Sequence, residues 1–426
     1  MSKQSKANSR ATDKTSESRD AAVDESKTEA KIKNQPYECD VAIVGAGPAG
    51  LSFACALAAS GLRICLVDKL AHEQLAEPAF DGRDIAMTHL SKTILEELKV
   101  WPRFPLAAVH PLKEATVQTG SSPYALHFER TDESQAPLGF LVANHAIRQA
   151  LYEQAIEHDN IHFYVDSEVV NVTSDDQRAM LTLDNHRTVY ANLVVAADSR
   201  FSQTRRMMGI GAKMKDFGRV MIVCNMDHQL SHQNKAQECF QYDRTCAILP
   251  LSEERSSIVI TVPASDAKAL IDLSPEAFAL QAKQFLGNRL GEMTLVTERH
   301  SYPLVGAYAD RFVGKRFALI GDAAVGMHPV TAHGYNLGLR SADTLATQIT
   351  KAHRAQRDIG SSQVLQQYQW RHQLLAKPLY ESTNAIVRLF NDDRVLAKIA
   401  RKAAVRVGNH FLPFKKLVTH RLTQIR

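Results

Sequence analysis

The sequence lacks the patterns that would place the protein among disulfide-rich, zinc-binding or secreted proteins. Its six cysteines are scattered through 426 residues without a C-x-x-C pair, so we expect neither a disulfide framework nor a metal site. H-E-x-x-H and P-loop motifs are also absent. Residues 1–36 hold six acidic residues and no apolar core for a signal peptide, and we interpret them as a disordered tail. We therefore expect a cytoplasmic protein.

Acidic residues are missing from the last part of the chain. Residues 394–426 contain nine Lys or Arg and no Asp or Glu, which leaves a net charge of −4 on the rest of a chain whose total is +5. A charge confined to one end argues against nucleic acid and favours an anionic membrane surface. A solvated helix face is the other interpretation. We expect peripheral membrane contact without a spanning segment.

One uncharged stretch, residues 41–62, is long enough at 22 residues to span a bilayer. Its internal order argues for something else. Residues 41–44 form a short apolar strand pattern, residues 45–50 are rich in Gly and Pro, and residues 51–60 form a small-residue helix pattern ending at Gly61. Residues 63–67 predict the next strand, which completes a βαβ unit.

The turn of this unit has the spacing of a dinucleotide-binding motif. Gly45 permits the turn, Gly47 lets backbone amides approach a pyrophosphate, and Gly50 allows the helix to lie close on the strand. Asp68 follows the second strand, where a carboxylate can accept hydrogen bonds from a ribose. The motif predicts a dinucleotide and leaves the choice between a flavin and a nicotinamide cofactor open.

Two later segments are similar to patterns of one group of flavoproteins. LVVAADSR, residues 193–200, resembles the strand and turn beside the flavin pyrophosphate, and FALIGDAA, residues 317–324, resembles the strand whose final Asp bonds the ribityl hydroxyls. HPVTAHGYNLGL, residues 328–339, resembles the loop and helix start beneath the flavin ring. This group is the single-component FAD-dependent aromatic hydroxylases.

Within that group the chain most resembles the ubiquinone-biosynthesis monooxygenases. DGRDIAMT, residues 81–88, is similar to their arginine-bearing segment, and residues 388–393 and 409–415 are similar to their final helices. The resemblance runs from about residue 37 to the C-terminus. Departures from the pattern are Ser199, where glycine is usual, Val325, the pair Ala332-His333 in place of Gly-Gln, and Arg340.

The resemblance implies an α/β fold, in which a Rossmann-like FAD-binding domain carries an inserted β-sheet substrate domain and is followed by C-terminal helices. We expect the FAD-binding domain over residues 37–210 and 299–360, the substrate domain over 211–298, and the helices over 361–426. Alternating β-branched residues within 220–262 predict strands of the inserted sheet. Ser274 and Pro275 predict the start of a helix there.

The same resemblance and the glycine motif give a set of expected FAD-binding residues. They are Gly45, Ala46, Gly47, Pro48, Ala49, Gly50, Asp68, Arg83, Asn144, Asp198, Gly321, Asp322, Pro329, Gly334, Tyr335 and Asn336. Asn144 is equally well explained as a helix N-cap.

Two residues are candidates for the chemistry itself. His333 lies where a base could remove a phenolic proton, but the favoured interpretation is that the loop acts only through its backbone and the side chain faces solvent or core. Arg83 could hold substrate or flavin, or form a surface salt bridge.

The activity implied by the resemblance is hydroxylation of the aromatic ring of a prenylated phenol or quinone precursor in ubiquinone biosynthesis. It would proceed through a C4a-hydroperoxyflavin, with O2 as co-substrate and NADH or NADPH as a transient reductant. Such substrates lie in lipid, so we expect peripheral association with the inner membrane, with other ubiquinone-biosynthesis proteins as candidate partners. Two alternatives remain: a non-catalytic FAD-folded subunit of a membrane-associated complex, and a flavin oxidoreductase that does not hydroxylate.

Overall fold

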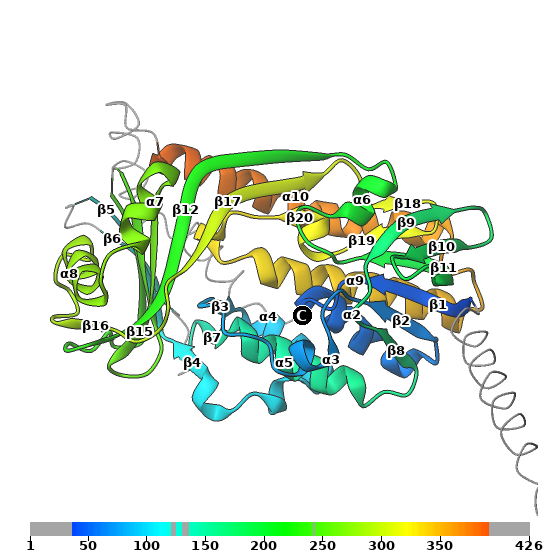
Figure 1. Ribbon diagram of the computed structural model, residues 1–426, viewed down its shortest axis with the longest axis horizontal. Coiled ribbons are helices and arrows are strands. Elements are labelled where there is room, and N and C mark those ends of the chain that lie inside the picture. Colours follow the sequence, from blue (N-terminus) through cyan, green and yellow to red (C-terminus); the bar gives the residue numbers. More distant parts are fainter. Residues whose placement is uncertain (1–35, 121–124, 130–135, 242, 392–426) are drawn as a thin grey trace, which may run out of the picture.

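The computed structural model describes residues 36–120, 125–129, 136–241 and 243–391. Within these ranges the chain forms three sheets, here called A, B and C. Sheet A lies at one end of the molecule, sheet C at the other and sheet B between them (Figure 1). The basic segment 394–426 and residues 1–35 of the expected tail lie outside the described residues.

Sheet A is the framework around the glycine motif. Its main path pairs neighbouring strands in the order β18, β19, β11, β1, β2, β8, and the links from β19 to β8 are parallel. Residues 41–44 are buried on both faces, as a central parallel strand requires. The strands are β1 (Tyr37–Val44), β2 (Ile64–Val67), β8 (Ile161–Tyr164), β9 (Val169–Ser174), β10 (Ala179–Leu183), β11 (Thr188–Ala196), β18 (Val313–Gly314) and β19 (Phe317–Leu319).

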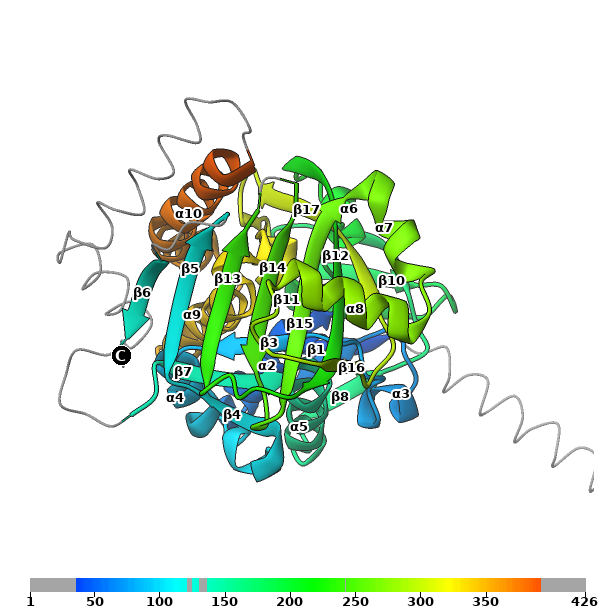
Figure 2. The same cartoon turned by 90° about the vertical axis from the view of Figure 1, so that its left-hand side faces the viewer.

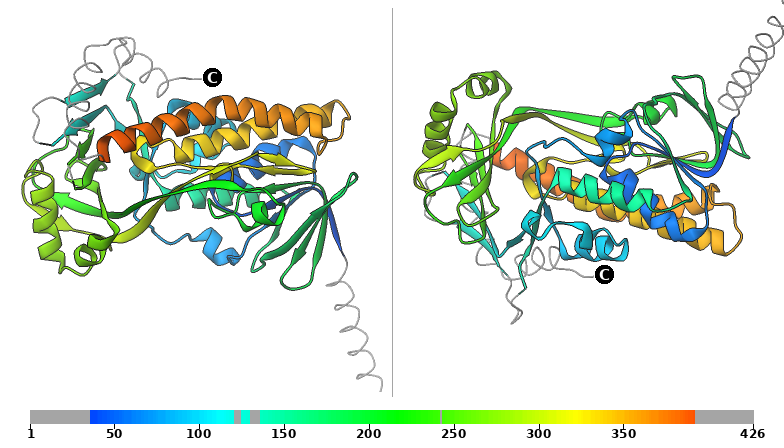
Figure 3. Two further views of the ribbon diagram at one scale, coloured as in Figure 1. Left: turned by 90° about the horizontal axis from the view of Figure 1, so that it is seen from above. Right: turned by 60° about the horizontal axis from the view of Figure 1, so that its bottom comes forward.

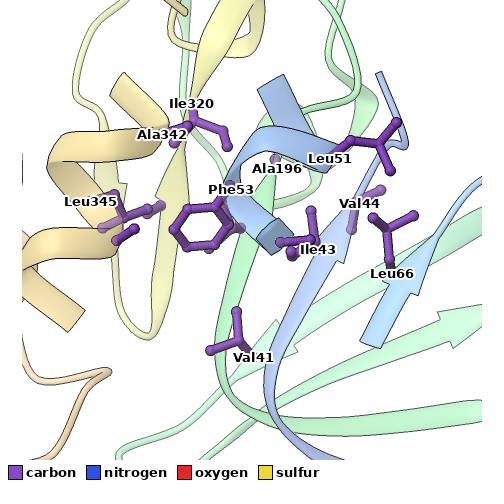
Figure 4. Packing of buried hydrophobic residues seen from close by; sticks show 14 of the residues in the cluster. Val41, Ile43, Val44, Leu51, Phe53, Leu66, Ala196, Ile320, Ala342 and Leu345 are labelled. Atoms are coloured by element: carbon purple, nitrogen blue, oxygen red, sulfur yellow. The ribbon is translucent and has the colours of Figure 1, made fainter. Parts of the chain in front are cut away.

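Helices cover sheet A and close the main core. Phe53 of α2 (Pro48–Leu57) lies between Leu345 of α9 (Gly334–Arg354) and Ile43 of β1 (Figure 4). All three side chains are fully buried, and burying each contributes roughly 1.5–3 kcal/mol. The remaining helical segments of this half are η1 (Ala58–Ser60), α3 (His72–Ala76), α4 (His89–Glu97), α5 (Asn144–Ile156) and α6 (Gln203–Met207).

Sheet C is larger than the inserted sheet expected from the sequence. Within the described residues it follows the order β20, β17, β12, β15, β14, β13, β5, β6, with β16 beside β12. It thus takes β5, β6, β17 and β20 from ranges that were expected to belong to the FAD-binding domain. Its strands are β5 (Glu114–Thr119), β6 (Ala125–Glu129), β12 (Ala212–His228), β13 (Lys235–Phe240), β14 (Thr245–Pro250), β15 (Arg255–Pro263), β16 (Met293–Leu295), β17 (His300–Ala309) and β20 (Val325–Gly326).

One face of sheet C carries the helices α7 (Ala264–Ile271) and α8 (Pro275–Phe285), and Figure 2 shows them in front of the strands. Ser274 caps α8 by accepting a hydrogen bond from the amide of Ala277, as the sequence predicted for the start of a helix. Below, this side is called the outer face of sheet C. The opposite, inner face looks toward sheet A.

Sheet B joins the two halves with β3 (Asp84–Met87), β4 (Val109–Leu112) and β7 (Gly139–Ala143). The helix α10 (Ser362–Asn391) runs along α9, as both views in Figure 3 show, and supports it over much of its length. Short 3-10 turns complete the described fold: η2 (Trp101–Arg103), η3 (Leu106–Ala108), η4 (Gly321–Ala323) and η5 (Pro329–Thr331).

Candidate functional site

The turn after β1 has the geometry expected from the glycine motif. Gly45 adopts a φ of +107°, which favours glycine, and its amide donates to the carbonyl of Val67 at 2.8 Å. A Cβ on Gly50 would lie 1.9 Å from the carbonyl oxygen of Gly45. The start of α2 can therefore approach β1 this closely only with glycine at position 50.

Gly47 occupies a different environment in the same turn. A Cβ added there would meet no atom within 4 Å, so the open space lies beside the backbone at the N-cap of α2. The first turn of α2 carries no acidic residue that would oppose an anion. Exposed amides and the positive end of a helix dipole suit a pyrophosphate, and the residues present therefore fit the phosphates of FAD.

Asp68 reaches back to this turn from the end of β2. Its Oδ2 accepts a hydrogen bond from the amide of Ala46 at 2.5 Å, and its Oδ1 accepts one from the amide of Leu70 at 2.9 Å. The carboxylate is thereby fixed beside the glycine turn. This is the placement needed for a group that accepts hydrogen bonds from a ribose.

Three segments that are far apart in the sequence meet at this turn. A Cβ on Gly45 would lie 2.7 Å from the carbonyl oxygen of Ala197, and one on Gly321 would lie 2.7 Å from Cβ of Ala49. The amide of Gly321 also donates to Oγ of Ser341 on α9 at 2.9 Å. The glycine turn, the end of β11 and the turn after β19 therefore form one site at the edge of sheet A.

The two aspartates of the later motifs are already engaged with the protein. Asp198 accepts hydrogen bonds from the hydroxyl of Ser202 and from the amide and hydroxyl of Thr204, which fixes the start of α6. Asp322 pairs with Arg200 at 2.8 Å. Arg200 thus ties the turn after β11 to the turn after β19, and among the described residues no hydrogen bond engages Oδ1 of Asp322.

Ser199 gives a prediction about stability. Its φ is +122°, in the region that favours glycine, which is the usual residue at this position in the resembling family. Holding a serine there costs on the order of 1 kcal/mol, and its Oγ gains only a 3.3 Å hydrogen bond from the amide of Phe201. We expect Ser199→Gly to raise the free energy of unfolding by about 1 kcal/mol in urea titrations, with unchanged FAD content. A decrease in stability would contradict this account of the turn.

The loop before α9 contains a neutral histidine. Burial, together with the smaller effect of the nearby charges of Lys215, Arg219 and Arg200, lowers the pKa of His328 to about 4. Its Nδ1 accepts from the amide of Val330 at 3.2 Å, so the ring proton lies on Nε2. Nε2 is buried and has no hydrogen-bond partner among the described residues. The ring of Phe217 packs edge-on against the imidazole, with 4.7 Å between the ring centres. His328 therefore presents an unused donor.

Asn336, at the start of α9, joins this helix to sheet B. Its Oδ1 accepts from the amide of Thr88 and the hydroxyl of Ser91, and its Nδ2 donates to the carbonyls of Ala86 and Ala332. These four contacts occupy its side chain, so a role toward FAD would fall to its backbone. Ala332 has a φ of +52° in place of the family's glycine.

The other residues expected beneath the flavin ring surround this helix start. Pro329 begins η5, His333 occupies the N-cap position of α9, and Gly334 is its first residue. Tyr335 is enclosed by protein, which raises the pKa of its hydroxyl well above the usual value. The structure therefore places His333 in the loop where the sequence predicted it.

Arg83 and Asn144 both contact Asp81, which was not among the site residues expected from the sequence. Oδ2 of Asp81 accepts from Arg83 at 2.5 Å and from Nδ2 of Asn144 at 2.7 Å. Burial alone would raise the pKa of Asp81, but these contacts lower it below the usual value. Asn144 is the first residue of α5 and is not its N-cap, which is Ala143. The sequence signal that could have identified Asp81 is its position two residues before Arg83.

Arg83 also contacts sheet C. Its guanidinium lies 5.2 Å from the ring centre of Tyr302 on β17, whose hydroxyl donates to the carbonyl of Asp81 at 2.6 Å. The side chain of Arg83 is 40% exposed. The next residue, Asp84, is enclosed, and burial raises its pKa to about 6. Residues 81–84 therefore link the half of the molecule that contains the glycine turn to the inner face of sheet C.

The inner face of sheet C is mainly apolar near its middle. Residues opposite one another in the register share a face, and one row on the inner face crosses five strands. The row consists of Val117, Glu238, Ala247, Val259 and Val223. An apolar surface of this kind, facing the loop before α9, suits an aromatic or prenylated molecule.

Known proteins similar to this chain agree with the geometry. Residues 38–383 match a family model described as an FAD binding domain. The chain is 48% identical over 388 residues to the ubiquinone hydroxylase UbiM of Neisseria meningitidis, covering 90% of this chain and 84% of that protein. It is 34% identical over 382 residues to the ubiquinone hydroxylase UbiL of Rhodospirillum rubrum, covering 89% and 88%.

A solved structure also shares the fold. The crystal structure of p-nitrophenol 4-monooxygenase PnpA from Pseudomonas putida DLL-E4 superimposes with a TM-score of 0.73 at 16% identity, covering 90% of this chain and 98% of that one. This likeness and the family model confirm the α/β fold with an FAD-binding domain that the sequence predicted.

Proposed function

The chain belongs to the FAD-dependent monooxygenases of ubiquinone biosynthesis, and we propose that it hydroxylates the aromatic ring of a prenylated phenol or quinone precursor. The observation that carries the proposal is the 48% identity to a ubiquinone hydroxylase over 90% of the chain. FAD is the cofactor of this family, and O2 and NAD(P)H are its usual co-substrates.

The cofactor would be held by the three converging segments. In this proposal the amides of Gly47, Ala49 and Gly50 at the start of α2 bind the pyrophosphate, Asp68 binds the adenosine ribose, and Asp322 binds the ribityl chain. Once bound, FAD supplies the two-electron and oxygen chemistry that amino-acid side chains lack. Asp198 and Arg200 would act by fixing the two turns between which the cofactor lies.

The start of α9 would tune the electrostatics at the ring. Backbone amides of residues 334–336 and the positive end of a 21-residue helix favour negative charge at that point. Asn336 holds this helix end against β3, so the amides are preorganised. His328 stays neutral at physiological pH, and its Nε2–H offers a hydrogen bond without adding a positive charge.

The substrate ring would lie between this loop and the inner face of sheet C. An apolar surface on that side excludes water, which protects reactive oxygen chemistry from loss to solvent. Arg83, which reaches across to Tyr302, would stand at the boundary between the two halves. We place it there as a residue that positions substrate or flavin, and we keep His333 as a candidate base.

A lipid-soluble substrate would require contact between the enzyme and a membrane surface. Among the described residues, no helix is both long and apolar enough to cross a bilayer. We propose peripheral contact through residues 394–426, whose nine basic residues would bind an anionic leaflet. We also propose that other ubiquinone-biosynthesis proteins bind the protein at that membrane surface.

Complementation tests the function. The gene would be introduced into bacterial strains that each lack one quinone ring hydroxylase, and accumulated intermediates would be identified by mass spectrometry. We expect one or more strains to regain ubiquinone, with loss of the matching intermediate, and Gly47→Ala to complement less well because it binds FAD more weakly. Failure in every strain by a stably expressed, FAD-loaded protein would favour the non-catalytic subunit. A reduced product without added oxygen would favour the oxidoreductase.

A further inference from the structure

Glu238 is an acidic residue on the inner face of sheet C. Its neighbours in β13, Gln237 and Cys239, both accept hydrogen bonds from Arg289, which follows α8 on the outer face. Side chains alternate along a strand, so Glu238 and Phe240 point the other way. The carboxyl group therefore faces the half of the molecule that contains the candidate flavin site.

The surroundings of Glu238 on this face are apolar. The register places Val117 of β5 on one side of it and Ala247 of β14 on the other, followed by Val259 and Val223. Glu238 is the single acidic member of this row. A carboxyl group surrounded by apolar side chains does not stabilise the folded protein, so its presence calls for a functional explanation.

The same patch of sheet C touches the loop before α9. Phe240 packs with Phe390 of α10, and Val117 and Val330 pack against this pair. Val117 lies beside Glu238 across the strands, Phe240 lies two residues along the same face, and Val330 belongs to η5. Glu238 thus lies beside a cluster that includes Val330 of the loop expected beneath the flavin ring.

The carboxyl group has no protein partner to explain it. Among the described residues, nothing donates a hydrogen bond to Glu238 or forms an ion pair with it, although the side chain is only half-buried. Burial alone raises its pKa to about 8. A partly accessible carboxyl enclosed by apolar surface, without a partner, has the environment of a group that meets a ligand.

We propose that Glu238 accepts the proton of the substrate's phenolic hydroxyl while the aromatic ring lies on the apolar row. This inference rests on the proposed function. The O–H bond of the phenol breaks, the proton moves to a carboxylate oxygen of Glu238, and the electron pair stays on the phenolate oxygen. The phenolate then donates electron density to the ring carbon that is hydroxylated, and no other reactant is needed for this step.

The protonation behaviour of Glu238 suits this role. A phenol has a pKa of about 10, and a carboxyl group whose pKa lies near 8 is a far better acceptor for its proton than an ordinary one. Only the deprotonated carboxylate accepts the proton, so activity rises as pH rises toward 8. No group on the apolar row competes in this range. Asp84 also meets the inner face of sheet C, near Ser257, but its pKa of about 6 lies below the range assigned to Glu238.

The other titratable groups around Glu238 point elsewhere. Cys239 and Cys246 lie on the outer face, and burial raises the pKa of both thiols. Arg289 also lies on that side. On the loop side, His328 is already neutral at pH values far below 8. In this proposal the ascending limb of the pH profile toward pH 8 belongs to Glu238 and not to His333, the other candidate base.

Glu238→Gln tests the role, because it keeps the shape of the side chain and cannot accept a proton. The FAD-loaded protein would be assayed with 2-farnesylphenol for hydroxylated product between pH 6 and 9. We expect turnover at pH 8 to fall by about a hundredfold or more, and the rise with pH to disappear, while FAD content stays at the wild-type level. Glu253→Gln, at an exposed turn of the same sheet, should leave turnover and its rise with pH unchanged.

Two further measurements separate the possible outcomes. The folded-state pKa of Glu238 lies above its unfolded value, so the carboxyl lowers stability as pH rises from about 4.5 to about 8, and Glu238→Gln should melt at a higher temperature than wild type at pH 8. The methyl ether of the probe, which has no proton to give, should be turned over equally slowly by both proteins. Wild-type turnover with an unchanged Glu238→Gln profile overturns this inference alone, whereas an FAD-loaded wild type that hydroxylates no probe overturns the proposed function.

Discussion

Gly50→Ala is expected to give protein that neither folds stably nor retains FAD. The added Cβ would lie 1.9 Å from the carbonyl oxygen of Gly45, and this atom belongs to the backbone of a turn that cannot rotate away. The start of α2 would have to leave β1, which would disturb the packing of Phe53 and Leu57. We expect a loss of more than about 3 kcal/mol, measured by urea unfolding, with little absorbance at 450 nm after purification.

Gly47→Ala is the matched control for this substitution. Its Cβ would meet no protein atom within 4 Å, so the protein should fold with wild-type stability. The methyl group would instead enter the space proposed for the pyrophosphate, and we expect the Kd for FAD to rise at least tenfold. If Gly47→Ala bound FAD as tightly as wild type, the turn would not be the pyrophosphate site. If Gly50→Ala were as stable as wild type, the close contact of α2 with the turn would be wrong.

Asn336→Ala is expected to destabilise the junction between α9 and sheet B. The substitution removes four hydrogen bonds and leaves the amide of Thr88 and the carbonyl of Ala86 without their partner. An unsatisfied polar group costs roughly 1–3 kcal/mol, so we expect a total loss of about 2–4 kcal/mol in the free energy of unfolding. FAD affinity should fall as well, because the amides at the start of α9 lose their fixed position.

Asn336→Asp separates the two halves of this interaction. The aspartate can still accept from Thr88 and Ser91, but it can no longer donate to Ala86 and Ala332, so stability should lie between wild type and Asn336→Ala. Differential scanning calorimetry and FAD titration of the three proteins would measure both effects. Equal stability of all three would show that Asn336 does not hold the helix to the sheet.

Local sequence was sufficient for the first βαβ unit. The strand, glycine turn and helix of residues 37–57 depend on short-range requirements, namely burial on both faces of β1, glycine at Gly45 and Gly50, and a helix that starts at Pro48. The meeting of this turn with Asp198 and Asp322 followed from resemblance to a family. The strand order β19, β11, β1 now accounts for it physically, because parallel neighbours end at the same edge.

Long-range pairing could not be predicted in the same way. β5 and β6 belong to sheet C because β5 pairs in parallel with β13, a contact between Glu114–Thr119 and Lys235–Phe240 that no local pattern reveals. The position of Glu238 depends on that register, and so it was not among the candidate site residues. Asp81 was missed because its importance comes from joining Arg83 and Asn144, which are distant in sequence.

The flavin content of the purified wild-type protein tests whether the three converging segments bind FAD. Three separate segments should enclose the dinucleotide tightly enough for it to survive gel filtration, and denaturation should then release FAD in about equal molar amount to the chain. We expect a yellow protein with flavin absorption near 450 nm. A colourless protein that takes up no FAD, even after refolding in its presence, would contradict it.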